Sequence, residues 1–127
     1  MKNGKPVILC VDDDQDTLDA IRVVLEAGGY VMEEAATGEE GVRQWKACKP
    51  DVVIVDLMME EVDAGVNCVR ELRLAGNTAP VYMLSSVGDQ LNQIANYAEL
   101  GLAGVFQKPV QPARLLAVLK AKLATRK

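Results

Sequence analysis

Two kinds of segment alternate along the chain, and their hydrophobic patterns predict two kinds of secondary structure. The first kind is a short run of apolar, largely β-branched residues, which is typical of strands buried on both faces of a parallel sheet. Such runs predict strands at residues 7–11, 52–55 and 81–84, and a weaker one at 104–107. A fifth run, at 30–35, carries two glutamates and therefore predicts a strand at the edge of the sheet.

The second kind of segment repeats its apolar residues with the period of an α-helix, so that they share one helix face. Glycine, proline and asparagine mark the breaks between segments. The predicted helices carry their apolar faces at Leu18, Ile21, Val24 and Leu25, at Val42, Trp45 and Cys48, at Val66, Val69 and Leu72, at Leu91, Ile94, Ala95 and Ala98, and at Leu115, Leu116, Leu119 and Leu123. The alternation predicts five strand–helix pairs, (βα)5, in a three-layer α/β sandwich with right-handed crossovers.

The length and composition narrow the class of protein. A chain of 127 residues suits a single domain covering residues 1–127, and its formal charge of −4 argues against a nucleic-acid or anionic-membrane surface. No apolar run is long enough to span a membrane, and the first residues do not form a signal peptide. The three cysteines fit no metal-binding spacing, which is typical of reduced thiols in a cytoplasmic protein.

The chain contains no histidine. This absence excludes a Ser-His-Asp hydrolase, a histidine-ligated zinc site and a phosphohistidine carrier. Any phosphoryl chemistry on this chain must therefore use carboxylates.

Polar side chains follow four of the five predicted strands. In sheets of this kind, ligands bind outside the carboxyl ends of the strands, so these residues are expected to converge on one site. They are Asp12, Asp13 and Asp14 after the first strand, Asp56 after the third, Ser85 and Ser86 after the fourth, and Lys108 with Pro109 after the fifth. Taken singly, each has an ordinary explanation, since Asp14 or Ser85 can cap a helix and Lys108 can be solvated. Taken together, they favour a charged site.

Three carboxylates in one pocket repel one another unless a cation lies among them. Mg²⁺ prefers oxygen ligands and often takes a phosphate oxygen as one of them. A lysine can contact one phosphoryl oxygen, a hydroxyl can donate to another, and a carboxylate can act as the nucleophile toward phosphorus. The residue set therefore predicts a Mg²⁺-dependent site for a phosphorylated aspartate.

With these residues, the sequence resembles the receiver domain of response regulators in two-component signalling, over essentially the whole chain. The stretch ILCVDD, residues 8–13, matches the family's first strand and acidic pair. The stretch VVIVDLMM, residues 52–59, matches the strand that ends at the phosphorylated aspartate. The resemblance is to the chemotaxis-regulator type, and it implies a flavodoxin-like fold with a five-stranded parallel sheet of order 2-1-3-4-5.

The resemblance implies a Mg²⁺ site built from four residues. Asp13 would bind the ion directly, and Asp12 would bind it partly through water. Asp56 would be both a metal ligand and the acceptor of the phosphoryl group. Met58 would contribute its main-chain carbonyl, so its side-chain type is free.

The resemblance also implies the groups that contact the phosphoryl oxygens. Ser85 matches the hydroxyl that switches toward the phosphoryl group, and Ser86 matches the small residue beside it. Lys108 matches the lysine that contacts the phosphate, and the peptide bond between Lys108 and Pro109 would be cis.

Receiver domains accept a phosphoryl group from the histidine of a sensor kinase or a phosphotransfer protein. They catalyse this transfer themselves and hydrolyse the product slowly, so the resemblance implies a phosphoprotein switch in a phosphorelay rather than an enzyme. Phosphorylation is expected to shift the face formed by the fourth helix, fifth strand and fifth helix. In the family this face binds a downstream output protein or domain, or a second receiver in a homodimer.

Two departures from the family pattern affect the site. Residues 59–60 are Met-Glu where Met-Pro is usual, and residues 63–64 are Asp-Ala where Asp-Gly is usual. Val105 replaces the aromatic residue that commonly stands three positions before the lysine, and the aromatic Phe106 falls on the opposite strand face. We therefore expect the signal to travel by shifts of loops and helices rather than by rotation of a ring.

Two further positions bear on how long the phosphoryl group persists. In the family, the residues at the positions of Met58 and Val87 flank the path of the attacking water. Both are apolar here and cannot orient a water molecule. We therefore expect slow self-dephosphorylation.

Two alternatives stay open. A pseudo-receiver would bind partners without becoming phosphorylated, although degenerate examples lose the acidic pair, the aspartate or the lysine, all of which are present here. A haloacid-dehalogenase-like phosphohydrolase would need Asp-x-Asp at its nucleophile, whereas Asp56 is followed by Leu57 and Met58.

Overall fold

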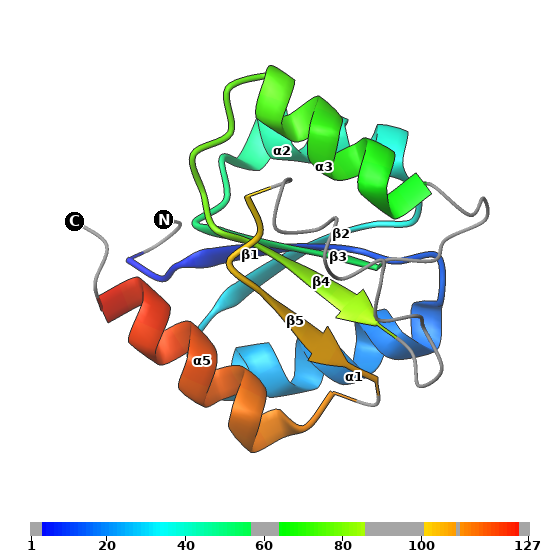
Figure 1. Ribbon diagram of the computed structural model, residues 1–127. Coiled ribbons are helices and arrows are strands. Elements are labelled where there is room, and N and C mark those ends of the chain that lie inside the picture. Colours follow the sequence, from blue (N-terminus) through cyan, green and yellow to red (C-terminus); the bar gives the residue numbers. More distant parts are fainter. Residues whose placement is uncertain (1–3, 57–63, 86–100, 109, 125–127) are drawn as a thin grey trace.

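The computed structural model describes residues 4–56, 64–85, 101–108 and 110–124, without the side chains of residues 64–66. Five strands form one parallel sheet with helices on both faces (Figure 1). The strands are β1 (Val7–Val11), β2 (Val31–Ala35), β3 (Val52–Asp56), β4 (Val81–Ser85) and β5 (Gly104–Gln107). The described helices are α1 (Gln15–Ala27), α2 (Gly38–Cys48), α3 (Ala64–Leu74) and α5 (Pro112–Ala124).

The strand order is β2-β1-β3-β4-β5, and every neighbouring pair is parallel. This order confirms the predicted flavodoxin-like sheet and places β2, with its two glutamates, at an edge. β3 and β4 each extend one residue beyond the predicted run, so that Asp56 and Ser85 are the last residues of strands rather than the first residues of loops. The helix predicted around residues 91–98 lies outside the described residues. Within the described ranges, no helix is long and apolar enough to cross a membrane.

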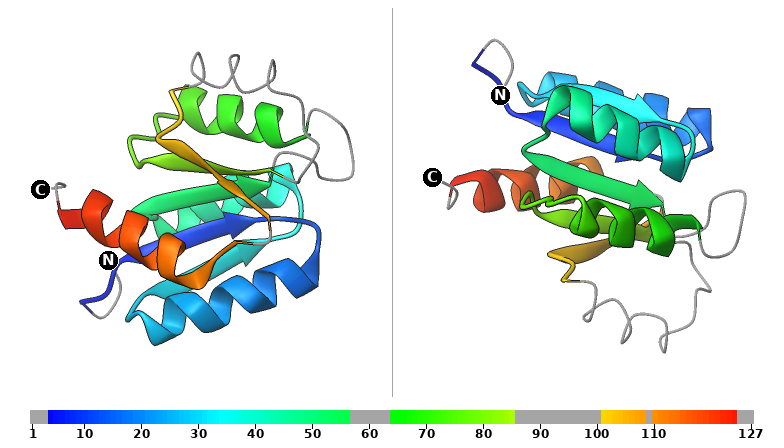
Figure 2. Two further views of the ribbon diagram at one scale, coloured as in Figure 1. Left: turned by 60° about the horizontal axis from the view of Figure 1, so that its bottom comes forward. Right: turned by 90° about the horizontal axis from the view of Figure 1, so that it is seen from above.

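Alternate residues of the buried strands face opposite helix layers. Leu9 and Val11 of β1 pack in the layer with α2 and α3, whereas Ile8 and Cys10 pack toward α1 and α5. The three views show these two helix pairs on opposite faces of the sheet (Figures 1 and 2). Both strand faces are therefore covered, which explains the continuous apolar runs. The predicted helix faces are buried at Leu18, Ile21, Leu25, Val69, Leu72, Leu115 and Leu119.

Two neighbouring apolar residues of β5, Val105 and Phe106, pack in opposite helix layers. Val105 is partly buried and packs in the layer with α2 and α3. Phe106 is buried in the layer with α1 and α5, where its ring centroid lies 5.2 Å from that of Tyr82. The predicted opposite orientation of Val105 and Phe106 is thus confirmed, and the Phe106 ring is part of the core.

A glycine allows α2 to pack closely against the end of β1. A Cβ atom at Gly41 would lie 2.8 Å from Val11 Cγ2, closer than real Cβ contacts allow, so a larger residue would force the helix away. Thr37 begins α2, because its hydroxyl accepts a hydrogen bond of 3.0 Å from the main-chain N–H of Glu40. This contact satisfies one of the free main-chain N–H groups at the beginning of α2.

Candidate functional site

Of the residues predicted to form a charged site, Asp12, Asp13, Asp56, Ser85 and Lys108 are described, and they lie at the carboxyl end of the sheet. β1 and β3 are neighbours, and Val11 pairs with Val55. This register places Asp12, the residue after β1, beside Asp56, the last residue of β3. β4 pairs with the other side of β3 and ends at Ser85, which is also buried. The topology therefore brings the ends of three strands to one place.

Three carboxylates form the centre of the site. Asp12, Asp13 and Asp56 each offer an oxygen, and these three atoms all lie within 4.8 Å of one another. Asp12 is fully buried and Asp56 is only 3% exposed, whereas Asp13 is exposed. Burying two neighbouring carboxylates is unfavourable unless positive charge compensates for them. The arrangement therefore requires a cation.

Lys108 supplies part of that positive charge. Its Nζ atom lies 3.0 Å from Asp12 Oδ2 and 3.2 Å from Asp56 Oδ1. The main-chain N–H of Lys108 donates a 2.7 Å hydrogen bond to the carbonyl oxygen of Ser85, which continues the pairing of β4 and β5 beyond the end of β5. The lysine is thus anchored by its main chain to β4 and by its side chain to the ends of β1 and β3.

Opposing effects determine the pKa of Lys108. Desolvation is the largest single effect and lowers the pKa, but the contacts with Asp12 and Asp56 and the charges of these carboxylates together outweigh it. The pKa is consequently raised above its ordinary value of 10.5. The ammonium group therefore stays protonated at physiological pH and bridges two carboxylates as a cation.

The two oxygens of Asp12 have different surroundings. Oδ1 accepts a 2.9 Å hydrogen bond from the main-chain N–H of Asp14, and the N–H of Asp12 itself donates to the carbonyl oxygen of Ala35 at 3.0 Å. Oδ2 is buried and accepts no hydrogen bond of good geometry from the described residues, although Lys108 approaches it as an ion pair. This oxygen therefore has capacity for a further cationic partner.

Asp14 has a separate, structural role as the N-cap of α1. Its carboxylate accepts hydrogen bonds from the main-chain N–H of Asp16 at 3.0 Å and from the Thr17 hydroxyl at 2.9 Å. The hydrogen bond from Thr17 is the main cause that lowers the pKa of Asp14. The ordinary explanation predicted for this residue is confirmed, which leaves Asp12 and Asp13 to the carboxylate cluster.

Some predicted residues lie outside the described ones. They are Met58 with its main-chain carbonyl, Ser86, Val87, Pro109 and the unusual loop at residues 59–63. The structure adds two main-chain partners of the site that no sequence pattern marks, the carbonyl of Ala35 and the N–H of Asp14. Main-chain groups are present at every residue, so only the fold reveals which of them contact Asp12.

Comparison with known proteins identifies the family. The family model of the response regulator receiver domain matches residues 8–120. The transcriptional regulatory protein PrrA of Mycobacterium leprae is 34% identical over 123 residues, which cover 97% of this chain and 52% of PrrA. The alkaline phosphatase synthesis transcriptional regulatory protein PhoP of Bacillus subtilis is 30% identical over 116 residues, which cover 91% of this chain and 48% of PhoP. The chain thus spans about half the length of these curated relatives.

A solved structure agrees with the fold and with the family match. The crystal structure of a CheY-like response regulator receiver domain protein from Methanospirillum hungatei superposes with a TM-score of 0.86. It is 26% identical, and the match covers 95% of each chain. The fold, the strand-end cluster and the family match together show that this chain belongs to the response regulator receiver domain family of two-component signalling.

Proposed function

We propose that residues 1–127 act as one phosphorylation switch, in which Asp56 accepts a phosphoryl group from a phosphohistidine. The observation that carries this proposal is the pairing of Asp56 with Lys108 across 3.2 Å inside a cluster of three carboxylates. A carboxylate can act as a nucleophile toward phosphorus, and a permanently charged lysine beside it can bind the oxygens of the arriving group. The donor would be a sensor histidine kinase or a phosphotransfer protein.

The donor set of the site fits Mg²⁺. Asp12, Asp13 and Asp56 offer the carboxylate oxygens that this ion prefers, and the buried Asp12 Oδ2 has capacity for another cationic partner. One ammonium cannot balance three carboxylates, so the site retains a negative charge that favours a divalent cation. We propose that these residues, with the main-chain carbonyl of Met58, hold the ion. When bound, Mg²⁺ would neutralise charge that develops on the transferred group.

The atoms that change bonds in the transfer all come from this chain and its partner. A carboxylate oxygen of Asp56 forms a bond to phosphorus, the bond between phosphorus and the partner's histidine nitrogen breaks, and the imidazole leaves with the electron pair. Lys108 keeps its proton, since its pKa is raised, and moves its contact from the Asp56 carboxylate to the phosphoryl oxygens. The Ser85 hydroxyl, at the end of the neighbouring strand β4, donates to another phosphoryl oxygen.

The output signal arises because Ser85 and Lys108 lie at the ends of β4 and β5. Phosphorylation adds negative charge and acceptor oxygens, which draw these two residues inward. The movement biases the face that includes β5, α5 and the helix predicted from the sequence around residues 91–98. That face binds an output domain, an output protein or a second copy of the receiver. With the Phe106 ring held in the core beside Tyr82, the shift travels through loops and helices rather than through a rotating ring.

The domain acts on its own aspartate and not on an external substrate, so we propose a switch and not an enzyme, working in the cytoplasm. Self-dephosphorylation is slow because Met58 and Val87 are apolar and cannot orient the attacking water. Replacing Met58 by Asn would supply a polar group at this position and accelerate the loss of phosphate. An unchanged decay rate of phosphorylated Met58→Asn would refute this part of the proposal.

Intact mass measurement tests the proposal. The purified domain is incubated with acetyl phosphate in the presence of Mg²⁺ or of a chelator, alongside Asp56→Ala and the exposed-acid control Asp19→Asn. We expect a gain of one phosphoryl group in the wild type and in Asp19→Asn, only with Mg²⁺, and no gain in Asp56→Ala. Where acetyl phosphate gives no gain, absence of Mg²⁺ binding in the same preparation would identify a pseudo-receiver.

A further inference from the structure

The segment that connects β1 to α1 carries two of the clustered carboxylates, and it is attached to β2 at both of its ends. At its beginning, the main-chain N–H of Asp12 donates to the carbonyl oxygen of Ala35 at 3.0 Å. At its end, Gln15, the first residue of α1, donates from Nε2 to Glu34 Oε1 at 3.3 Å. Glu34 and Ala35 are the last two residues of β2. Asp12 and Asp13 therefore lie between two contacts with the same strand.

The Glu34 carboxylate is held by two residues of α1. Gln15 contacts Oε1, and Arg22 donates from Nη2 to Oε2 at 2.9 Å. Arg22 also donates from Nη1 to the carbonyl oxygen of Met32, in the same strand, at 3.3 Å. The side-chain amide of Gln15 is oriented in turn by Asp19 Oδ1, which accepts from its Nε2 at 2.8 Å. Each oxygen of Glu34 thus has a partner on α1, and these partners lie about two helical turns apart.

The positions of the two carboxylates depend on where α1 begins. Asp12 Oδ1 accepts a 2.9 Å hydrogen bond from the main-chain N–H of Asp14, and Asp14 is the N-cap of α1. The Asp13 side chain is exposed, and within the described residues no hydrogen bond or ion pair holds it. A displacement of the first turn of α1 relative to β2 would therefore move the donor that orients Asp12 and would move Asp13 itself.

A purely structural role explains only part of this network. The side chains of Arg22 and Glu34 are 34% and 33% exposed, and ion pairs at such positions contribute little to stability. The buried residues Leu18, Ile21 and Leu25 already pack α1 against the sheet. Attachment of the helix does not require that the same glutamate also contact the first residue of α1. That contact determines where α1 begins.

We propose that Glu34, held by Gln15 and Arg22, is a positioning residue for the Mg²⁺ ligands Asp12 and Asp13. This inference rests on the proposed function, in which these two aspartates hold the ion. Replacing residues that orient metal ligands from outside the coordination sphere commonly lowers the affinity for the ion. Glu34 acts by fixing the beginning of α1, and it does not contact the metal.

Three substitutions separate positioning from an effect of charge alone. Gln15→Ala changes no charge, Arg22→Met removes a positive charge, and Glu34→Ala removes a negative charge. Charge alone predicts unchanged, tighter and weaker Mg²⁺ binding, respectively. Positioning predicts weaker binding in all three variants. The matched control is Glu33→Ala, because Glu33 is the neighbouring glutamate of β2 and its side chain points to the opposite face of the sheet.

Calorimetric titration with Mg²⁺ measures the affinity. We expect Glu34→Ala to weaken binding about tenfold, Gln15→Ala and Arg22→Met about threefold each, and Glu33→Ala less than about twofold. Combining Glu34→Ala with Arg22→Met should weaken binding no further than Glu34→Ala alone, because Arg22 acts through Glu34. All variants should unfold at urea concentrations close to that of the wild type, since the replaced side chains are partly or fully exposed.

Hydrogen exchange without metal supplies a readout that does not depend on Mg²⁺. The N–H of Asp14, which donates to Asp12 Oδ1, should exchange about threefold faster or more in Glu34→Ala and at the wild-type rate in Glu33→Ala. The inference is overturned if this exchange is unchanged in Glu34→Ala, if Arg22→Met binds Mg²⁺ more tightly, or if both glutamate variants weaken binding equally. Wild-type protein that binds no Mg²⁺ would instead refute the proposed function, and the exchange of Asp14 would still decide whether Glu34 positions the segment.

Discussion

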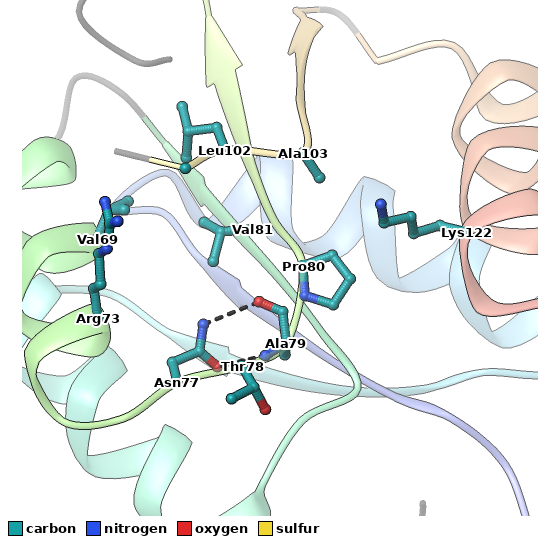
Figure 3. Close-up of a pocket in the computed structure, with 11 residues that line it drawn as sticks. Val69, Arg73, Asn77, Thr78, Ala79, Pro80, Val81, Leu102, Ala103 and Lys122 are labelled. Carbon is teal, nitrogen blue, oxygen red and sulfur yellow. Dashed lines mark hydrogen bonds between the residues drawn. The ribbon is translucent and has the colours of Figure 1, made fainter. Parts of the chain in front are cut away.

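The two ends of the sheet carry charges of opposite sign, which are buried at the carboxyl end and at least partly exposed at the amino end. At the carboxyl end, Asp12 and Asp56 are buried and share one ammonium, Lys108. At the amino end, Arg73 and Lys122 line a cavity around the beginning of β4 (Figure 3). In a parallel sheet with crossover helices, helix N-termini gather at one end and C-termini at the other, and the helix dipoles favour acids at the first and cations at the second.

Burial determines how much charge each end of the sheet can carry without a partner. Buried, mutually repelling carboxylates are unfavourable for stability, and they persist where a metal ion or a reaction uses them. Cations at a partly exposed rim cost little and can remain without any ligand. The buried charges of the carboxyl end therefore need a compensating cation, whereas the basic side chains of the amino end do not need a ligand.

The largest expected effect comes from breaking the charge balance of the carboxyl end with Lys108→Met. This change leaves Asp12 and Asp56 buried without their ammonium partner, so the free energy of unfolding at neutral pH should fall by about 3 kcal/mol. Added Mg²⁺ should restore more stability to the variant than to the wild type, because it replaces the missing positive charge. Urea unfolding with and without Mg²⁺ measures both effects, with Lys120→Met as the control. A loss no larger than the control's would contradict a buried ion-pair network.

The next largest effect is expected from Asn77→Ala, which changes the segment 77–79 at the amino end of the sheet. The variant loses three hydrogen bonds, and the partly buried indole N–H of Trp45 loses its acceptor, so the free energy of unfolding should fall by about 2 kcal/mol. Tryptophan emission should change in the folded state. Thr78→Ala, beside it on the exposed surface, should change both by much less. Similar stability of the two variants would show that the hydrogen bonds of Asn77 do not stabilise this segment.

A smaller effect is expected at the carboxyl end from Asp13→Asn, which should change Mg²⁺ affinity more than stability. Asp13 is exposed, so its substitution should hardly change stability, but it removes one anionic ligand of the proposed Mg²⁺ site. Mg²⁺ affinity measured by calorimetry should fall about tenfold, equivalent to about 1.4 kcal/mol. The control is Asp16→Asn, an equal charge change in the first turn of α1. Equal weakening in both variants would indicate a general charge effect instead of coordination.

The smallest effect concerns the core between the two ends, at Cys68. Burial raises the pKa of this thiol from 9.0 to about 12. Above pH 9 the unfolded chain loses this proton while the folded chain keeps it, so the free energy of unfolding should decrease with pH, by up to about 1.4 kcal/mol per pH unit. Cys68→Ala should make this slope smaller between pH 9 and 10.5 and leave the part that is due to Cys10, the other buried thiol with a raised pKa. An identical slope in wild type and Cys68→Ala would show that the thiol titrates normally.

The sequence alone predicted most of the carboxyl end. Apolar runs ending in Asp, Ser and Lys identify strand ends, and parallel strands bring those ends together, so Asp12, Asp56, Ser85 and Lys108 could be placed near one another. The sequence could not predict that one ammonium contacts both buried carboxylates, because this depends on side-chain reach across three strands. It did single out Asp14 as a possible helix cap, and the structure confirms that role.

The amino end was not predictable in the same way. Arg73 and Lys122 lie in different helices, and neither is part of a motif. Only the packing of α3 and α5 on opposite faces of the sheet brings them to one cavity around the beginning of β4. In the sequence, Asn77 only marks a break between two segments, after Gly76. Its three hydrogen bonds are seen only in the structure.

We propose that Asp56, among three clustered carboxylates, is the one that accepts the phosphoryl group. Borohydride reduces an acyl phosphate to an alcohol, so an aspartyl phosphate becomes homoserine, and peptide mass mapping then locates it. After incubation with acetyl phosphate and Mg²⁺, we expect homoserine at position 56. After incubation without Mg²⁺, we expect no homoserine. Homoserine at position 12 or 13, or no homoserine in a protein that has gained a phosphoryl group, would contradict it.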